Sequence, residues 1–164
     1  MIVLGVDPGA ATTGYGVVAR SGGTISLLEC GVVRTDPATR LPQRLKEIYQ
    51  GISEVLTRHP VDVVAVEGVF FGKNARTTVI LGHARGAILL AATMRDLPVA
   101  EYSPAEIKNA VVGTGRATKE QVQFMVQRLL RLKAPPQPSD AADGVAVALC
   151  HCHSPAILRE TVYR

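Results

Sequence analysis

Residues 2–18, IVLGVDPGAATTGYGVV, decide the fold. Ile2–Val6 is a continuous apolar run rich in β-branched residues, which is typical of a strand buried on both faces. The run ends at Asp7, and Pro8-Gly9 breaks it before a second apolar run begins near Gly14. The stretch therefore predicts a hairpin whose first strand places one carboxylate at the rim of a sheet.

Residues 61–67, VDVVAVE, repeat this pattern and end in a second acid, Glu67. Apolar residues at helical spacing between the two runs predict a helix over about 42–58. A strand, a helix of this length and another strand form a crossover, so we expect the strand at 62–67 to lie parallel to the first strand. Parallel neighbours would bring Asp7 and Glu67 together at the edge where open α/β sheets bind ligands.

Further strands are expected at about 14–20, 24–34 and 98–102, and a further long helix at about 75–95. Capping boxes at Ser103-Pro104-Ala105-Glu106 and at Thr118-Lys119-Glu120-Gln121 predict two more helix starts. The last helix is expected to run to about His153, with Ser139 as its cap.

Asp140 and Asp143 are three residues apart, so they share one face of the first turn of this last helix. Acids at this end also favour the positive end of the helix dipole, which is the alternative explanation of the pair. The question that the sequence poses is whether these two carboxylates meet Asp7 and Glu67.

Size and composition indicate one globular α/β domain over residues 1–153, followed by a tail, 154–164, that we expect to be frayed. The sequence offers neither an export signal nor an apolar run that could span a bilayer, so a cytoplasmic location without membrane contact is expected. The formal charge of +4 and pI of about 9.2 permit nucleic-acid binding.

The chain has three cysteines, an odd and sparse set that favours reduced thiols. The run Cys150-His151-Cys152-His153 is a poor zinc motif, because zinc ligands are usually spaced so that they can converge. We interpret it as the buried end of a helix.

Residues 69–76, VFFGKNAR, follow Glu67 directly and hold two of the three phenylalanines of the chain. Aromatic and basic side chains beside an acidic site suggest stacking on unpaired bases, although one or both rings could instead pack under the loop. The loop at 112–116, VGTGR, lacks the P-loop pattern. The candidate DNA contacts are Phe70, Phe71, Lys73, Asn74, Arg76, Lys108, Arg116 and Lys119.

The helix at 75–95 is rich in small residues. They allow close approach of another element, which is either the sheet of the same chain or a second copy of the helix in a dimer.

Three or four clustered carboxylates repel one another unless cations bind between them. Hard oxygen ligands suit Mg²⁺ or Mn²⁺, and two such ions can activate a water and stabilise the leaving oxygen of a phosphodiester. The acids, with Lys108 and Lys119 for phosphate binding or charge stabilisation, therefore point to metal-assisted phosphodiester hydrolysis.

Five motifs, in order over residues 2–153, resemble the RuvC family of Holliday junction resolvases: GVDPG…TGYGVV, VEGVFFGKNA, GHARGAI, EIKNAVVGTGRATKEQVQ and SDAADGVAVALCHCH. The resemblance implies a ribonuclease H-like fold with a five-stranded mixed sheet flanked by helices. It also implies a homodimer that binds four-way DNA junctions and symmetrically nicks two strands of like polarity, alongside the RuvA-RuvB branch-migration complex.

Carried over by position, the resemblance makes Asp7, Glu67, Asp140 and Asp143 the metal-binding acids, Phe70 the aromatic that stacks on a base, and Lys108 and Lys119 the basic residues near the scissile phosphate. Family members have Asp or His at the position of Asp140. Ala10-Ala11 stands where Ser-Arg is common, and Gly68 where Gln is common, so DNA contacts from those side chains are in doubt.

Two alternatives belong to other functional classes. A phosphate-handling ATPase or sugar kinase has a similar first hairpin but needs two lobes, for which this chain is short. A junction-binding scaffold with an inactive acid cluster would bind DNA without cleaving it.

Overall fold

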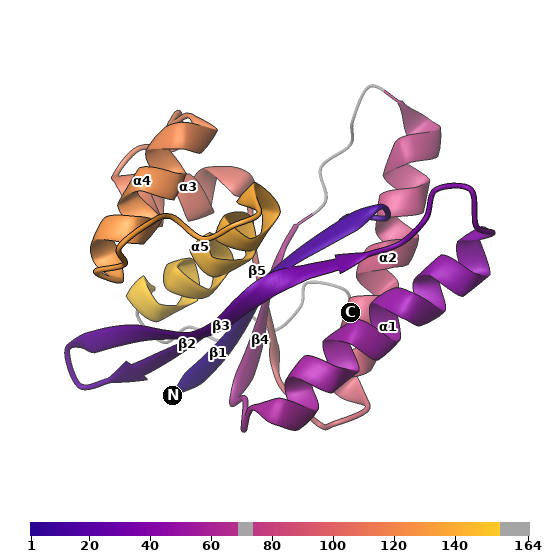
Figure 1. Cartoon of the computed structure of the whole chain (residues 1–164), viewed down its shortest axis with the longest axis horizontal. Helices are drawn as coiled ribbons and strands as arrows, with labels where there is room; N and C mark the ends of the chain where they lie inside the picture. Colours follow the sequence, from indigo (N-terminus) through magenta and orange to yellow (C-terminus); the bar gives the residue numbers. More distant parts are fainter. Residues whose placement is uncertain (69–73, 155–164) are drawn as a thin grey trace.

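The computed structural model describes residues 1–68 and 74–154, in which a five-stranded mixed sheet is covered by five helices (Figure 1). This is the expected architecture. The strands are β1 (Ile2–Asp7), β2 (Thr12–Ser21), β3 (Thr24–Arg34), β4 (Val63–Glu67) and β5 (Val99–Tyr102). The helices are α1 (Leu41–Arg58), α2 (Ala75–Thr93), α3 (Pro104–Val112), α4 (Lys119–Leu129) and α5 (Ser139–His153).

The strand order is β3-β2-β1-β4-β5. The first three strands form an antiparallel meander, and β1 pairs in parallel with β4, which confirms the predicted crossover. β5 extends the parallel half of the sheet beyond β4. The carboxyl-terminal ends of β1, β4 and β5 therefore lie at one edge.

Two helical layers enclose the sheet: α1 and α2 cover one face, and α3, α4 and α5 cover the other (Figure 1). Side chains of a strand alternate between the faces. Leu4 and Val6 of β1 belong to the core beneath α1 and α2, whereas Val3 belongs to the core beneath α5. By the same alternation, the side chain of Asp7 lies on the α5 face.

Helix α5 lies unusually close to the first hairpin, because glycines face each other across the contact. A Cβ atom on Gly14 would come within 1.8 Å of the carbonyl oxygen of Asp140, and one on Gly144 within 2.4 Å of Tyr15 Cα. Only hydrogen fits at these two positions. The close contact places the first turns of α5 against the strand that carries Asp7.

Two predicted capping boxes are confirmed and one predicted cap is wrong. Ser103 and Thr118 each exchange hydrogen bonds with the third helical residue, as expected. Ser139 does not cap α5, since it is the first helical residue and Pro138 stands at the N-cap without a side-chain hydrogen bond. Proline suits this position because its nitrogen has no hydrogen to satisfy.

Element ends differ from the sequence expectation by one or two residues. Strand β2 begins at Thr12 rather than Gly14, because Thr12 and Thr13 pair with the end of β3. Helix α2 ends at Thr93 rather than Arg95, three residues before Asp96, which takes a positive φ of 55°. None of these shifts moves a candidate site residue to another face.

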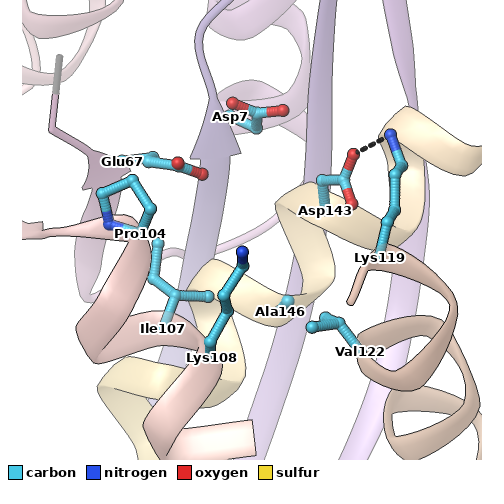
Figure 2. Close-up of a pocket in the computed structure, with 9 residues that line it drawn as sticks. All are labelled: Asp7, Glu67, Pro104, Ile107, Lys108, Lys119, Val122, Asp143 and Ala146. Atoms are coloured by element: carbon cyan, nitrogen blue, oxygen red, sulfur yellow. Dashed lines mark ion pairs between the residues drawn. The ribbon is translucent and has the colours of Figure 1, made fainter. Parts of the chain in front are cut away.

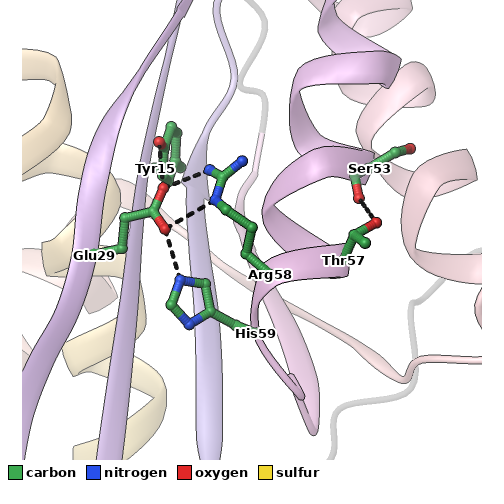
Figure 3. Close-up of polar contacts among 6 residues, drawn as sticks. All are labelled: Tyr15, Glu29, Ser53, Thr57, Arg58 and His59. Carbon is green, nitrogen blue, oxygen red and sulfur yellow. Dashed lines mark hydrogen bonds and ion pairs between the residues drawn. The ribbon is translucent and has the colours of Figure 1, made fainter.

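A polar cluster ties α1 to the sheet (Figure 3). Glu29 of β3 accepts a hydrogen bond from the Tyr15 hydroxyl at 2.9 Å and forms ion pairs with Arg58 at 2.5 Å and with His59 at 2.6 Å. Its partners hold the pKa of Glu29 at about 2, and the hydrogen bond from Arg58 is the largest cause. Helix α1 is thereby fixed at its carboxyl-terminal end.

The small residues of α2 divide between two surfaces. Ala84, Ala91 and Ala92 are buried in the core between α2 and the sheet. Gly82 and Gly86 face open space and form one stripe along the helix with the exposed Val79 and Leu90. Among the described residues, we find no helix with both the length and the apolarity required to cross a bilayer.

Candidate active site

Asp7 and Glu67 occupy the ends of two adjacent parallel strands (Figure 2). Val6 pairs with Val66, so the acid that follows each of them lies at the same edge of the sheet. Both side chains reach the α5 face, where they line one cavity. The predicted meeting of these two acids is therefore confirmed.

Helix α5 brings Asp143 to the same cavity, which has a volume of about 290 Å³. Asp140 does not line it, but its charge contributes to the raised pKa of Asp7, so it lies within electrostatic reach. The remaining walls come from α3, α4 and α5. They consist of Pro104, Ile107, Lys108, Lys119, Val122 and Ala146.

Burial of the carboxylates that line the cavity, together with their mutual repulsion, raises the pKa values of two of them. The pKa of Asp7 is raised to about 7, first by burial and then by the charges of Glu67, Asp143 and Asp140. Burial and the charge of Asp143 also raise the pKa of Glu67. Such shifts arise where carboxylates share a poorly hydrated site, and a cation between them would remove the cost.

Two lysines approach the acids from the α3–α4 side, with their ammonium groups directed toward the carboxylates (Figure 2). The Nζ atom of Lys119 pairs with Asp143 Oδ2 at 2.7 Å, and this hydrogen bond is the main cause of its raised pKa. The capping box at Thr118 sets Lys119 as the first residue of α4. The charge of Lys108 partly offsets the rise in the pKa of Glu67.

The other predicted DNA contacts are partly outside the described residues and partly on other elements. Phe70, Phe71 and Lys73 fall outside the described residues. Asn74 caps α2 by accepting a hydrogen bond from the backbone N–H of Thr77 at 3.2 Å. The exposed Arg76 lines a groove between the first turns of α1 and α2, and Arg116 is exposed in the turn between α3 and α4. Neither arginine lines the acidic cavity.

The donor set suits hard divalent ions. Among residues 1–68 and 74–154, no three Asp, Glu, His or Cys side chains converge on one point closely enough to enclose an ion. Mg²⁺ is commonly held by only one or two carboxylates, with water and phosphate oxygens completing its octahedron. Carboxylates that open onto a cavity fit that mode of binding.

The Cys-His run of α5 has other partners. Cys150 and Cys152 are buried in the core beneath α5. His151 Nδ1 lies 2.8 Å from the hydroxyl of Tyr102, and His153 Nδ1 lies 3.2 Å from the carbonyl oxygen of Ala110. These residues therefore join the end of α5 to β5 and α3.

Sequence reasoning missed the apolar walls of the cavity and the pair formed by Tyr102 and His151. Pro104 could have been found, because it follows the cap of the helix that carries Lys108. For Ile107, Val122 and Ala146, apolar spacing signals burial but not proximity to a site. The contact between Tyr102 and His151 has no signal in the sequence.

The strand order, with helices on both faces of the sheet, is that of a ribonuclease H-like fold, and three of the predicted acids line one cavity at an edge of its sheet. The family model described as crossover junction endodeoxyribonuclease RuvC matches residues 3–151. The chain belongs to the RuvC family.

Curated relatives with that description include a protein from Shewanella loihica, 55% identical over 93% of this chain and 87% of its own length. Another, from Desulforamulus reducens, is 50% identical over 92% of this chain and 93% of its own. A solved structure of Thermus thermophilus RuvC in complex with a Holliday junction substrate is 41% identical, with a TM-score of 0.88 over 93% of each chain. The yeast mitochondrial Holliday junction resolvase shares the fold alone, at 11% identity and a TM-score of 0.63 over 92% of this chain and 78% of its own.

Proposed function

We propose that Asp7, Glu67, Asp140 and Asp143 hold two divalent metal ions, Mg²⁺ with Mn²⁺ as a substitute, at the centre that resolves Holliday junctions. The observation that carries this assignment is that Asp7, Glu67 and Asp143 line one cavity, where burial and the charges of three neighbouring carboxylates raise the pKa of Asp7 to about 7. A protein core tolerates such a cluster when cations bind to it.

Divalent ions held by these carboxylates would supply a nucleophile from water and stabilise charge on the leaving oxygen. The carboxylates of Asp7 and Glu67 hold the ions at a fixed edge, because both are anchored on central strands. Lys108 and Lys119 bind the scissile phosphate and stabilise the charge that develops on it. The apolar side chains of Ile107 and Val122 limit the access of bulk water.

The substrate is four-way junction DNA, and the phosphodiester bonds of two strands of like polarity are nicked symmetrically. The support is membership of the RuvC family together with the junction-bound state named for the Thermus thermophilus structure. We assign recognition of unpaired bases to Phe70 and Phe71, with Lys73, Asn74, Arg76 and Arg116 as backbone contacts. In the sequence, Phe70, Phe71 and Lys73 directly follow Glu67 and Gly68 at the end of β4, and Arg116 precedes α4.

Paired nicks require two active sites, so we propose a homodimer. The stripe on α2 formed by Val79, Gly82, Gly86 and Leu90 supports this assembly, because it is exposed and apolar or small along one helix face. Glycines on such a face allow a second helix to approach closely. Residues 1–153 would form the nuclease domain of each protomer.

In the cell we place this activity in the cytoplasm, where chromosomal DNA of bacteria is found, together with the RuvA-RuvB complex that moves the junction. Family membership is the support for both assignments.

The deciding experiment compares a synthetic four-way junction with a linear duplex of the same sequence, each with Mg²⁺, Mn²⁺ or a chelator. We expect paired nicks in the junction alone and only with metal. Equal cutting of both substrates would contradict the proposal that the nuclease selects the four-way junction over linear duplex. Binding without cutting in either metal would instead establish a junction-binding scaffold.

A further inference from the structure

Tyr102 lies next to Glu67 at the carboxyl-terminal edge of the sheet. The two residues are partners in the parallel pairing of β4 and β5, and the N–H of Gly68 donates to the carbonyl oxygen of Tyr102 at 2.9 Å. The ring of Tyr102 is only 6% exposed and packs in the core beneath α5. The backbone of Tyr102 therefore helps to fix the place where Glu67 leaves the sheet.

The other end of Tyr102 reaches α5. Its hydroxyl lies 2.8 Å from His151 Nδ1, and the two rings meet edge to face with centroids 5.9 Å apart. His151 is about two turns beyond Asp143 on the same helix. One side chain thus connects the strand edge that carries Glu67 with the helix that carries Asp143.

Burial lowers the pKa of His151, which favours the neutral form of its ring. A neutral imidazole can accept the phenolic proton at Nδ1 while Nε2 keeps its hydrogen. A hydrogen bond between a buried phenol and a partly buried imidazole is costly to break, because water has limited access to the two groups. This bond therefore resists small shifts of α5 relative to β5.

Tyr102 also immediately precedes the helix that carries Lys108. Ser103, the next residue, caps α3 through its capping box with Glu106. A displacement of Tyr102 would therefore shift the positions of Glu67, Asp143 and Lys108 together. Metal and phosphate sites are sensitive to displacements of well under an ångström, since the groups that orient ligands set their affinity.

We propose that Tyr102 and His151 are positioning residues that set the separation of the carboxylates on β4 and α5, and thereby the metal affinity and cleavage rate of the site. The inference rests on the proposed function. Neither side chain lines the acidic cavity, so both act through Glu67 and Asp143.

Tyr102→Phe is the direct test, because it removes one oxygen and keeps the buried ring. Tyr15→Phe is the matched control: it removes a hydroxyl bonded to Glu29 on the opposite face of the sheet. We expect Tyr102→Phe to weaken Mn²⁺ binding, followed by the free Mn²⁺ signal in electron paramagnetic resonance, by about three- to tenfold. Single-turnover junction cleavage at fixed Mn²⁺ should fall in parallel, while Tyr15→Phe should match the unmodified chain in both measurements.

A second variant tests the coupling. His151→Leu should reproduce the loss, and combining it with Tyr102→Phe should add little, because both changes break the same bond. His151→Gln, whose amide oxygen can accept the phenolic proton, should restore part of the metal affinity. Metal binding and cleavage by Tyr102→Phe within twofold of the Tyr15→Phe control would overturn the inference. Additive losses in the double variant would also overturn it. Failure of the unmodified chain to cleave would overturn the proposed function, and this inference with it.

Discussion

Replacing Asp7 by Asn should abolish cleavage and, without metal, make the protein more stable at alkaline pH. Asp7→Asn keeps the size of the side chain but removes its charge and its capacity to hold a metal ion. In the native protein the pKa of Asp7 is about 7, against an ordinary value of 3.8. The carboxylate is therefore a functional group that the fold holds at a cost in stability.

The sign of the effect follows from proton linkage. The folded state binds the Asp7 proton more tightly than the unfolded state. The free energy of unfolding therefore carries no penalty from Asp7 below about pH 4, and it declines as the pH rises through about 7. At about 1.4 kcal/mol per pH unit, the difference between the two pKa values sets an upper limit of about 4 kcal/mol. Because the neighbouring carboxylates share the repulsion, we expect about 2–4 kcal/mol at pH 8.

Urea unfolding in chelator, at pH 8 and at pH 4, measures the difference in free energy of unfolding between Asp7→Asn and the unmodified chain. Asp7→Asn should be more stable at pH 8 and nearly equal at pH 4, and it should bind a four-way junction in chelator as the unmodified chain does. Added Mg²⁺ should stabilise the unmodified chain more than the variant. A variant that is less stable at pH 8, or whose advantage does not depend on pH, would refute the electrostatic reasoning.

Four further outcomes are expected. Glu29→Gln should cost about 1–2 kcal/mol at pH 7 after screening of its partly exposed side chain, and the difference should fade as acid titration proceeds from pH 4.5 to about 2, where the folded-state pKa lies. Gly14→Ala should lower the free energy of unfolding by at least about 3 kcal/mol, measured in urea, because its Cβ would overlap the carbonyl group of Asp140. Lys119→Gln should slow single-turnover cleavage by at least about tenfold with junction affinity nearly kept, since it loses the charge that we propose to stabilise the scissile phosphate. Phe70→Ala should impair junction cleavage without a large change in melting temperature; a large drop would place the ring in the core.

The parallel core of the sheet could be predicted because its signals are local and strong. Apolar runs at 2–6 and 63–66 are too continuous for an exposed strand, and the helix between them requires a crossover. Once β1 and β4 are parallel neighbours, Asp7 and Glu67 must share an edge. Two of the proposed metal ligands therefore follow from the pattern of the chain alone.

Contacts between distant residues could not be predicted in this way. The β-bulge near Leu28, which accompanies the pairing of Glu29 with Val17, appears only when β2 and β3 are aligned. The hydrogen bond between Tyr102 and His151 depends on how far α5 extends along the sheet. Ser139 was a reasonable cap by residue type, but the start of α5 is decided by the proline before it. Residue types and spacing do not encode these distances.

The glycines of the first hairpin show how a local signal can have a long-range cause. In the sequence, Gly14 and Gly16 indicate the limits of a strand. In the fold, a Cβ on Gly16 would lie 2.4 Å from Val145 Cγ2, and one on Gly5 would lie 2.3 Å from the backbone nitrogen of Ala148. Strands β1 and β2 thus present glycines to α5 at these points, and the helix packs closely against the strand backbones. Because this contact fixes the depth of α5, it fixes how closely Asp143 approaches Asp7, so substitutions at these glycines should change metal binding even where the protein still folds.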